Sequence, residues 1–158
     1  MSPSPARSTS SAGRFSNTAL VLEQSTLPKP LRELVQLRVG RLDGCGLCVD
    51  IHTKEAAAAG ESALRLHLVA TWRHSTVFTE AERAALALTE EATVLDRNGV
   101  TDATRAGARE HFDDDRLGAL VCLIALINAA TRMNVVVHQK GGSFEPGMFA
   151  DPQDRSGD

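Results

Sequence analysis

The sequence centres on Gly44-Cys45-Gly46-Leu47-Cys48-Val49-Asp50-Ile51-His52, a Cys-x-x-Cys pair followed four residues later by a histidine. Cys45, Cys48 and His52 recur at steps of three and four, which places both sulfurs and the imidazole on one face of a predicted helix. Neighbours at these spacings have Cβ atoms about 5 to 6 Å apart, so we expect His52 to reach the Cys48 sulfur directly or through a water molecule. The stretch therefore predicts a helix whose first turn carries a chemically active pair of thiols.

Redox chemistry is the function that this pair most directly predicts. Two thiols separated by two residues close a small disulfide ring, and the start of a helix stabilises a thiolate through unpaired N–H groups and the helix dipole. The chain has three cysteines, which cannot all pair internally, and in a reducing compartment a lone Cys-x-x-Cys serves catalysis or metal binding. We expect a Cys45–Cys48 disulfide to be transient. Cys122 lies in an apolar run and is expected to be a packing residue.

A zinc site is the first alternative for the same motif, because Cys45, Cys48 and His52 could supply three ligands. A structural zinc site needs a fourth, and the sequence has no second Cys-x-x-Cys and no His-x-x-x-His to provide it, so Cys122, Glu33 or another histidine would have to come from a distance. Haem attachment would require a histidine directly after Cys48. Redox chemistry is therefore favoured, and we expect neither a bound metal nor a cofactor.

The composition and periodicity of the remaining chain predict an all-α fold of about six to seven helices. Of the 158 residues, 42% are hydrophobic, only 4% are aromatic and none is tyrosine, which favours helices packed through small and unbranched side chains. Pro30 suits the first turn of a helix, and Thr79-x-x-Glu82 is a capping box. The expected helices span residues 30–42, 45–59, 61–73, 79–95, 101–112 and 114–137.

Three segments organise the chain: a disordered arm over residues 1–15, a helical domain over 16–138 and a flexible tail over 139–158. A net charge of −3 with interspersed signs predicts neither nucleic-acid binding nor attachment to a membrane. The apolar run 117–130 is too short to span a bilayer, so we expect a helix buried in the core or between subunits, and hence a homo-oligomer. No secretory signal is evident, and a cytoplasmic location is expected.

Glu33 is a further candidate because it lies on the helix before the cysteine pair. It shares a helical row with Leu37 and with Gly40, which permits close approach, so its carboxylate could be partly buried. The spacing alone favours another interpretation, in which Glu33 is an exposed carboxylate or pairs with a neighbouring arginine of the same helix. These arginines are Arg32, Arg38 and Arg41.

Several stretches of the sequence, taken in their order along the chain, resemble those of a known protein family. They are Glu33-Leu34-Val35-Gln36-Leu37-Arg38, the Cys45 to Ala56 segment, Trp72-Arg73, Phe78-Thr79-Glu80-Ala81-Glu82-Arg83, and Ile124 to Asn134. A glutamate, a Cys-x-x-Cys twelve residues on and a histidine four further on form a specific combination. On these residues the chain resembles the alkylhydroperoxidase AhpD-like branch of the carboxymuconolactone decarboxylase family, over roughly residues 31–137.

The resemblance implies an all-helical fold assembled as trimers or hexamers, and an antioxidant enzyme that reduces hydroperoxides through a dithiol–disulfide cycle. In the family's scheme Cys48 would attack the peroxide, Cys45 would resolve the sulfenic acid to a disulfide, and Glu33 and His52 would relay protons. The partners would be a hydroperoxide substrate and a thiol or dithiol reductant, lipoyl-linked in the best-studied members. Those members carry a histidine between the cysteines, where this chain has Leu47.

Other functions remain open at the level of sequence. A non-enzymatic redox sensor would form the same disulfide without turnover, and a structural zinc module would lose its fold on chelation. The family also includes ring-opening decarboxylases that act without this cysteine pair, so the fold alone does not decide the function.

Overall fold

The computed structural model describes Phe15, Thr18 and residues 24–148. Except for Phe15, the predicted arm over 1–15 lies outside the described residues, and so does the part of the predicted 139–158 tail from residue 149 on. Within the described part all regular structure is helical, which confirms the predicted all-α fold. The elements are α2 (Lys29–Leu42), α3 (Gly46–Ala58), α4 (Ala63–Leu68), the 3-10 helix η1 (Val69–His74), α5 (Glu80–Thr93), α6 (Asp102–His111) and α7 (Asp114–Val136).

Most helices begin at a side chain that caps them. Thr79 and Glu82 form the predicted capping box at α5, and Asp113 accepts a hydrogen bond from the backbone N–H of Arg116 at the start of α7. Such caps satisfy the N–H groups that the first turn leaves unpaired. Because a cap depends on residues within the first turn, the sequence alone predicts closely where such a helix begins.

The prediction of one helix over residues 61–73 is wrong. The segment forms α4 and then η1, and the break falls at Thr71, whose φ of −121° and ψ of 30° are not helical. Next to the break, Trp72 is buried and its Nε1 donates to Glu90 Oε1 at 2.7 Å. A contact with a distant helix thus accompanies the departure from the local helical pattern.

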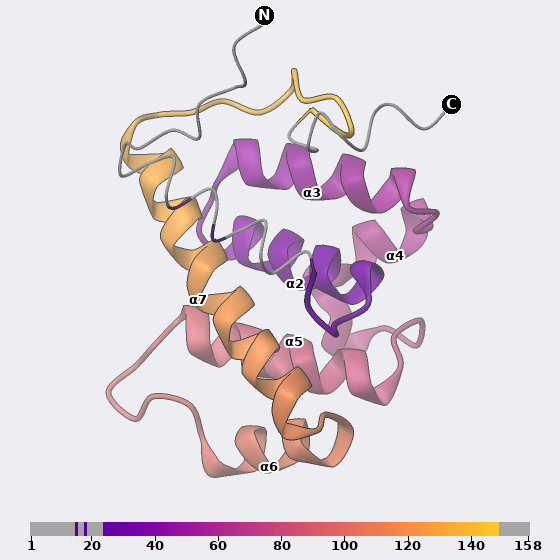
Figure 1. Ribbon diagram of the computed structural model, residues 1–158, viewed down its shortest axis with the longest axis vertical. Coiled ribbons are helices and arrows are strands. Elements are labelled where there is room, and N and C mark those ends of the chain that lie inside the picture. The colour runs from indigo at the N-terminus through magenta and orange to yellow at the C-terminus, as the bar shows by residue number, and fades with distance from the viewer. Residues whose placement is uncertain (1–14, 16–17, 19–23, 149–158) are drawn as a thin grey trace, which may run out of the picture.

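Helix α2 lies at the centre of the fold and contacts α3, α5 and α7. Figure 1 shows α3 along one side of α2, and it shows α5 and α6 beyond the opposite side. The long α7 runs across these helices at one edge of the fold. Leu31 and Val35 of α2 pack in a cluster with α5, α6 and α7, whereas Leu34 and Leu37 pack in a second cluster with α3, η1 and α5. The central helix is therefore buried on two sides.

Helix α7 is apolar almost all round, yet only part of it is buried. Its buried side chains include Leu120, Ile124 and Ile127, whereas Val121 is 51% exposed and Val136 is 75% exposed. The predicted packing role of Cys122 is wrong, because this residue is exposed. By length and composition alone α7 could cross a membrane, a test that core helices of soluble proteins also pass. Here it packs against α2 and α5.

Helices α2 and α3 approach closely at Gly40. A Cβ placed there would lie 3.2 Å from the Cβ of Cys48 and 3.3 Å from the backbone nitrogen of Val49, closer than side chains normally pack. Neither atom is the free end of a flexible side chain. The glycine therefore permits the approach that the sequence predicts, and it brings the start of α3 against α2.

We predict that Gly40→Ala is about 1–3 kcal/mol less stable than Gly107→Ala, the cost typical of overpacking. Both changes replace a helical glycine and gain the same helix propensity, but the space around Gly107 in α6 is open. Urea unfolding followed by circular dichroism measures the difference. Equal stabilisation by the two substitutions would contradict the close approach at Gly40.

Candidate active site

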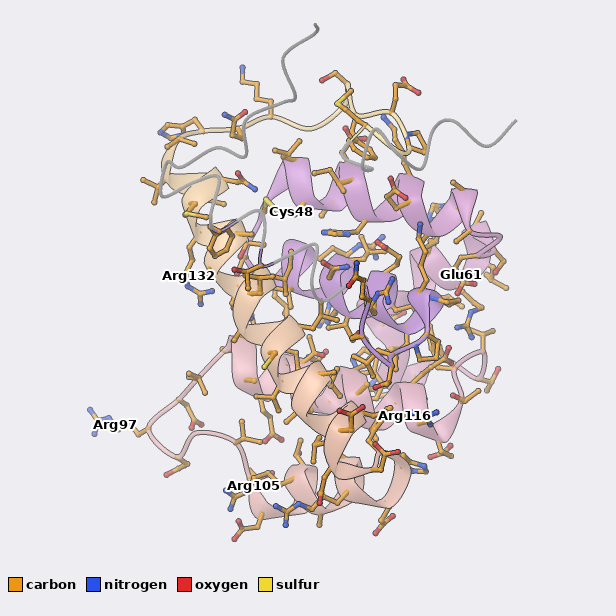
Figure 2. The ribbon with its side chains drawn as sticks, in the orientation of Figure 1. Cys48, Glu61, Arg97, Arg105, Arg116 and Arg132 are labelled. Carbon is orange, nitrogen blue, oxygen red and sulfur yellow. A yellow bond between two sulfur atoms is a disulfide. The ribbon has the colours of Figure 1, made fainter. Side chains whose placement is uncertain are left out.

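The two cysteines of the motif lie at the N-terminus of α3 and are joined by a disulfide, with their Cα atoms 5.3 Å apart. Cys45 is the N-cap residue, and its sulfur accepts a hydrogen bond from the backbone N–H of Cys48 at 3.2 Å. The side chains are 1% and 2% exposed respectively. Figure 2 shows Cys48 at the start of α3, beside α7. The pair is thus buried, and it has the helix-terminal setting that the sequence predicts.

Glu33 and His52 meet across the α2–α3 interface. Glu33 is 7% exposed, and its Oε2 lies 2.9 Å from His52 Nδ1. An ionised carboxylate only accepts hydrogen bonds, so with Glu33 ionised the imidazole donates from Nδ1, and Nε2 of a neutral ring is left as a proton acceptor. The pair therefore holds one tautomer of the histidine, one helical turn beyond Cys48.

The interpretation of Glu33 as an exposed carboxylate is wrong, and two of the neighbouring arginines, Arg38 and Arg41, bond elsewhere. Arg38 donates to Glu90 of α5 from both Nε and Nη2, and Arg41 donates to the backbone carbonyls of Leu66 and His67. Burial raises the pKa of Glu90, but hydrogen bonds from Trp72, Arg73 and Arg38 outweigh it and leave the pKa below its usual value. Arg38 and Arg41 therefore have other partners, and the Glu33 carboxylate bonds to the imidazole of His52.

A polar side chain from α7 completes the surroundings of the disulfide. Asn134 Nδ2 donates to Cys48 Sγ at 3.5 Å, within the range of a hydrogen bond to sulfur. The sequence indicates only that Asn134 would need a partner if buried. Because 86 residues separate it from Cys48, no local spacing relates the two.

The turn before the cysteine pair is fixed to the same part of α7. Asp43 Oδ2 accepts from Thr131 Oγ1 at 2.5 Å and from Arg132 Nη1 at 3.2 Å. Arg132 also bonds to Asn128 Oδ1 at 2.5 Å. The last turns of α7 therefore hold both the turn that precedes Cys45 and the sulfur of Cys48.

Residues 141–148, which we call the C-terminal strap, return from α7 along α3 (Figure 1). The backbone N–H groups of Gly142 and Phe144 donate to Asp50 Oδ2 at 2.6 and 3.0 Å, and Lys54 Nζ donates to the carbonyl of Phe144 at 2.7 Å. The hydrogen bond from Lys54 and these two N–H groups hold the pKa of Asp50 at about 2. At Gly141 the backbone contacts Gly46 with no room for a Cβ.

The C-terminal strap is part of the flexible tail that the sequence predicts over residues 139–158. Of that segment the structure describes residues 139–148, in which Phe144 is buried and Gly147 donates to Glu55 Oε1 at 2.8 Å. These contacts tie this part of the segment to α3. The domain boundaries themselves stay a prediction.

The structure thus brings all four predicted residues, Glu33, Cys45, Cys48 and His52, to the junction of α2 and α3. It adds Asn134 from α7. Leu47, between the cysteines, is half-buried. Among the described residues, no group of three or more His, Cys, Asp or Glu side chains lies in an arrangement that could hold a metal ion.

A comparison with known protein families finds a match that includes the four predicted site residues. A model of the carboxymuconolactone decarboxylase family matches residues 13–91, half of the chain, a range that contains the glutamate, both cysteines and the histidine. The chain belongs to the carboxymuconolactone decarboxylase family. The sequence resemblance to this family is therefore confirmed.

Relatives of this family member extend the match. The uncharacterized protein YdfG of Bacillus subtilis (strain 168) is 31% identical over 121 residues, which are 77% of this chain and 82% of that protein. The solved structure of ATU0492 from Agrobacterium tumefaciens has a TM-score of 0.83 and 28% identity over 87% of this chain and 94% of that one. ATU0492 has no known function and is provisionally described as an antioxidant defence protein AhpD.

A structure from Ralstonia eutropha JMP134, described as an alkylhydroperoxidase AhpD core and an uncharacterized peroxidase-related protein, has a TM-score of 0.73. It is 20% identical and covers 84% of this chain and 71% of that one, a likeness that shows the fold alone. The likeness to ATU0492 places this carboxymuconolactone decarboxylase family member in the AhpD-like branch, and the Ralstonia structure shares its fold.

Proposed function

We propose that this AhpD-like protein is a thiol-dependent peroxidase, an antioxidant disulfide oxidoreductase that reduces hydroperoxides. The observation that carries the proposal is the buried Cys45–Cys48 pair at the start of α3, with a hydrogen-bonded Glu33–His52 pair one turn further along. A thiolate and a positioned proton carrier are the two groups that peroxide reduction needs from a protein.

The proposed cycle starts with reduced thiols. The Cys48 thiolate attacks the terminal oxygen of the hydroperoxide and breaks its O–O bond, so that Cys48 becomes a sulfenic acid and an alkoxide or hydroxide leaves. His52, held by Glu33, takes the proton of the Cys48 thiol on Nε2 when the thiolate forms and then gives it to the leaving oxygen. Cys45 then attacks the Cys48 sulfur, water leaves, and the Cys45–Cys48 disulfide forms. A thiol or dithiol donor returns two electrons and two protons to the pair.

The surroundings of the pair support this division of roles. His52 follows Cys48 by four residues on the same helix, so the two side chains are neighbours one turn apart. Cys45 lies a further turn away from the imidazole. The donor is proposed to be a small thiol or dithiol, or a lipoyl group, because both sulfurs are buried in the disulfide form. Leu47 offers no proton relay between the cysteines, so the proposal gives the whole proton transfer to Glu33 and His52. A cytoplasmic location would keep such a donor reduced.

The first prediction concerns Cys48. With cumene hydroperoxide as oxidant and dithiothreitol as reductant, the unchanged protein consumes peroxide over many turnovers, whereas Cys48→Ser is expected to lose this activity. Cys122→Ser is the matched control, because its thiol is exposed and outside the site. Peroxide loss is followed by a ferrous-iron colour assay, and disulfide formation by mass spectrometry of the peptide that contains both cysteines.

Equal peroxide consumption by the Cys48→Ser variant would overturn the proposal. Formation of one disulfide per chain without further turnover, with any of several dithiols, would instead support the redox sensor. Zinc bound in a one-to-one ratio by the reduced protein, with loss of the fold on chelation, would support the structural module.

A second prediction concerns the Glu33–His52 pair. Glu33→Gln keeps the shape of the side chain but removes the carboxylate that positions the imidazole. It is expected to slow peroxide reduction by about 10²–10⁴-fold, the range typical of a lost general acid–base pathway. Glu80→Gln is the control, since that carboxylate is 81% exposed. If both variants match the parent protein in rate, the proton relay is wrong.

We also propose that the protein is a homo-oligomer, a trimer or hexamer. The support is the exposed apolar side of α7, which includes Val121 and Val136. The variant Val121→Lys/Val136→Lys is expected to lower the mass measured by light scattering, whereas Leu95→Lys, an exposed apolar site outside α7, is expected to leave it unchanged. A monomeric mass for the unchanged protein would contradict this proposal.

A further inference from the structure

The two sulfurs of the pair have different hydrogen-bond donors. Cys45 Sγ accepts from the backbone N–H of Cys48, a donor that the start of any helix supplies. Cys48 Sγ accepts from Asn134 Nδ2, a side-chain donor on α7. Only the second donor depends on the identity of a residue, so only the second can be removed by substitution.

We propose that Asn134 is a catalytic residue that stabilises the Cys48 thiolate by donating a hydrogen bond from its amide. A hydrogen bond made to the charged form of a group favours that form and lowers the pKa of an acid. A thiolate accepts more strongly than a disulfide sulfur, so this contact is expected to strengthen when the pair is reduced. An amide has no titration in the working range, and it donates at every pH.

The orientation of the amide follows from the partner. Sulfur in either oxidation state presents lone pairs and no proton when it is a thiolate or a disulfide. The amide oxygen of Asn134 in the same position would face those lone pairs without a proton between them. The nitrogen is therefore the atom that faces Cys48, as the 3.5 Å contact has it.

The contact is well placed to persist when the disulfide opens, because other bonds hold α7 to the same site. Thr131 and Arg132, one turn or less before Asn134, both bond to Asp43 in the turn that leads to Cys45. Thr131 is completely buried. At the other end, the carbonyl of Asn134 accepts from the backbone N–H of Gln139 at 2.9 Å, where α7 ends. The position of Asn134 thus does not depend on the disulfide.

This inference rests on the proposed function only for its consequence, since a stabilised Cys48 thiolate is the form that would attack peroxide. The hydrogen bond itself is independent of any substrate. Its test therefore measures the thiol directly and uses no peroxide.

The experiment isolates each thiol in turn. In Cys45→Ser/Cys122→Ser protein, Cys48 is the only thiol, and its alkylation by iodoacetamide between pH 5 and 10, followed by mass spectrometry, reports its pKa. Adding Asn134→Leu is expected to raise that pKa by about one to two units, the size of a hydrogen bond to a charged group. At pH 7 the alkylation rate is then expected to fall about tenfold or more.

Asn134→Asp serves as a second variant of nearly the same shape. It loses the donor and adds a negative charge, so it is expected to raise the pKa of Cys48 at least as far as Asn134→Leu does. In the matched control, Cys48→Ser/Cys122→Ser, the only thiol is Cys45, and Asn134→Leu is expected to leave its pKa unchanged. Circular dichroism confirms that each variant is folded.

Folded Asn134 variants in which Cys48 titrates as in the unsubstituted background would overturn the inference. An equal shift of Cys45 and Cys48 would also overturn it, because a general loosening of the site, rather than one hydrogen bond, would then be responsible. A shift confined to Cys48 in a protein that consumes no peroxide would support Asn134 as the thiolate donor while the proposed peroxidase function fails.

Discussion

Helices α2 and α3 cross at Gly40, where a Cβ would lie only 3.2 Å from the Cβ of Cys48, and this close crossing holds the two halves of the candidate site together. Glu33 comes from α2, whereas Cys48 and His52 come from α3. A larger residue at the crossing would push against Cys48 Cβ and the backbone of Val49. Because the Glu33–His52 hydrogen bond spans the same interface, a small separation of the helices would weaken it.

Helix α7 contributes a second, independent support. Its outer side is apolar and exposed, but its final turns are polar where they meet the cysteine loop, through Thr131, Arg132 and Asn134. The proposed redox cycle breaks and remakes the bond between Cys45 and Cys48. The contacts of Thr131 and Arg132 with Asp43 do not involve the disulfide, so they can hold the loop in both states.

The charged groups of the fold divide into separate sets. Glu90 accepts hydrogen bonds from Arg38, Arg73 and the indole of Trp72. Asp50 forms an ion pair with Lys54 and accepts hydrogen bonds from two backbone N–H groups of the C-terminal strap. Glu33, although it shares a helix with several arginines, bonds to a histidine. The partner of this buried carboxylate is thus an imidazole and not a permanent cation, and the proposed proton relay uses this contact.

The sequence by itself determined most of the helices, the capping box of α5, and the face of α3 that carries both cysteines and His52, because these features depend on spacing within a few residues. The row that Glu33 shares with Leu37 and Gly40 allowed its burial, but the packing of α2 decided it. Only the tertiary structure decided that Glu33 bonds to His52, that residues 61–73 break at Thr71, that Cys122 is exposed, and that Asn134 reaches Cys48. Periodicity defines the faces of a helix, but the packing of distant segments decides which faces meet.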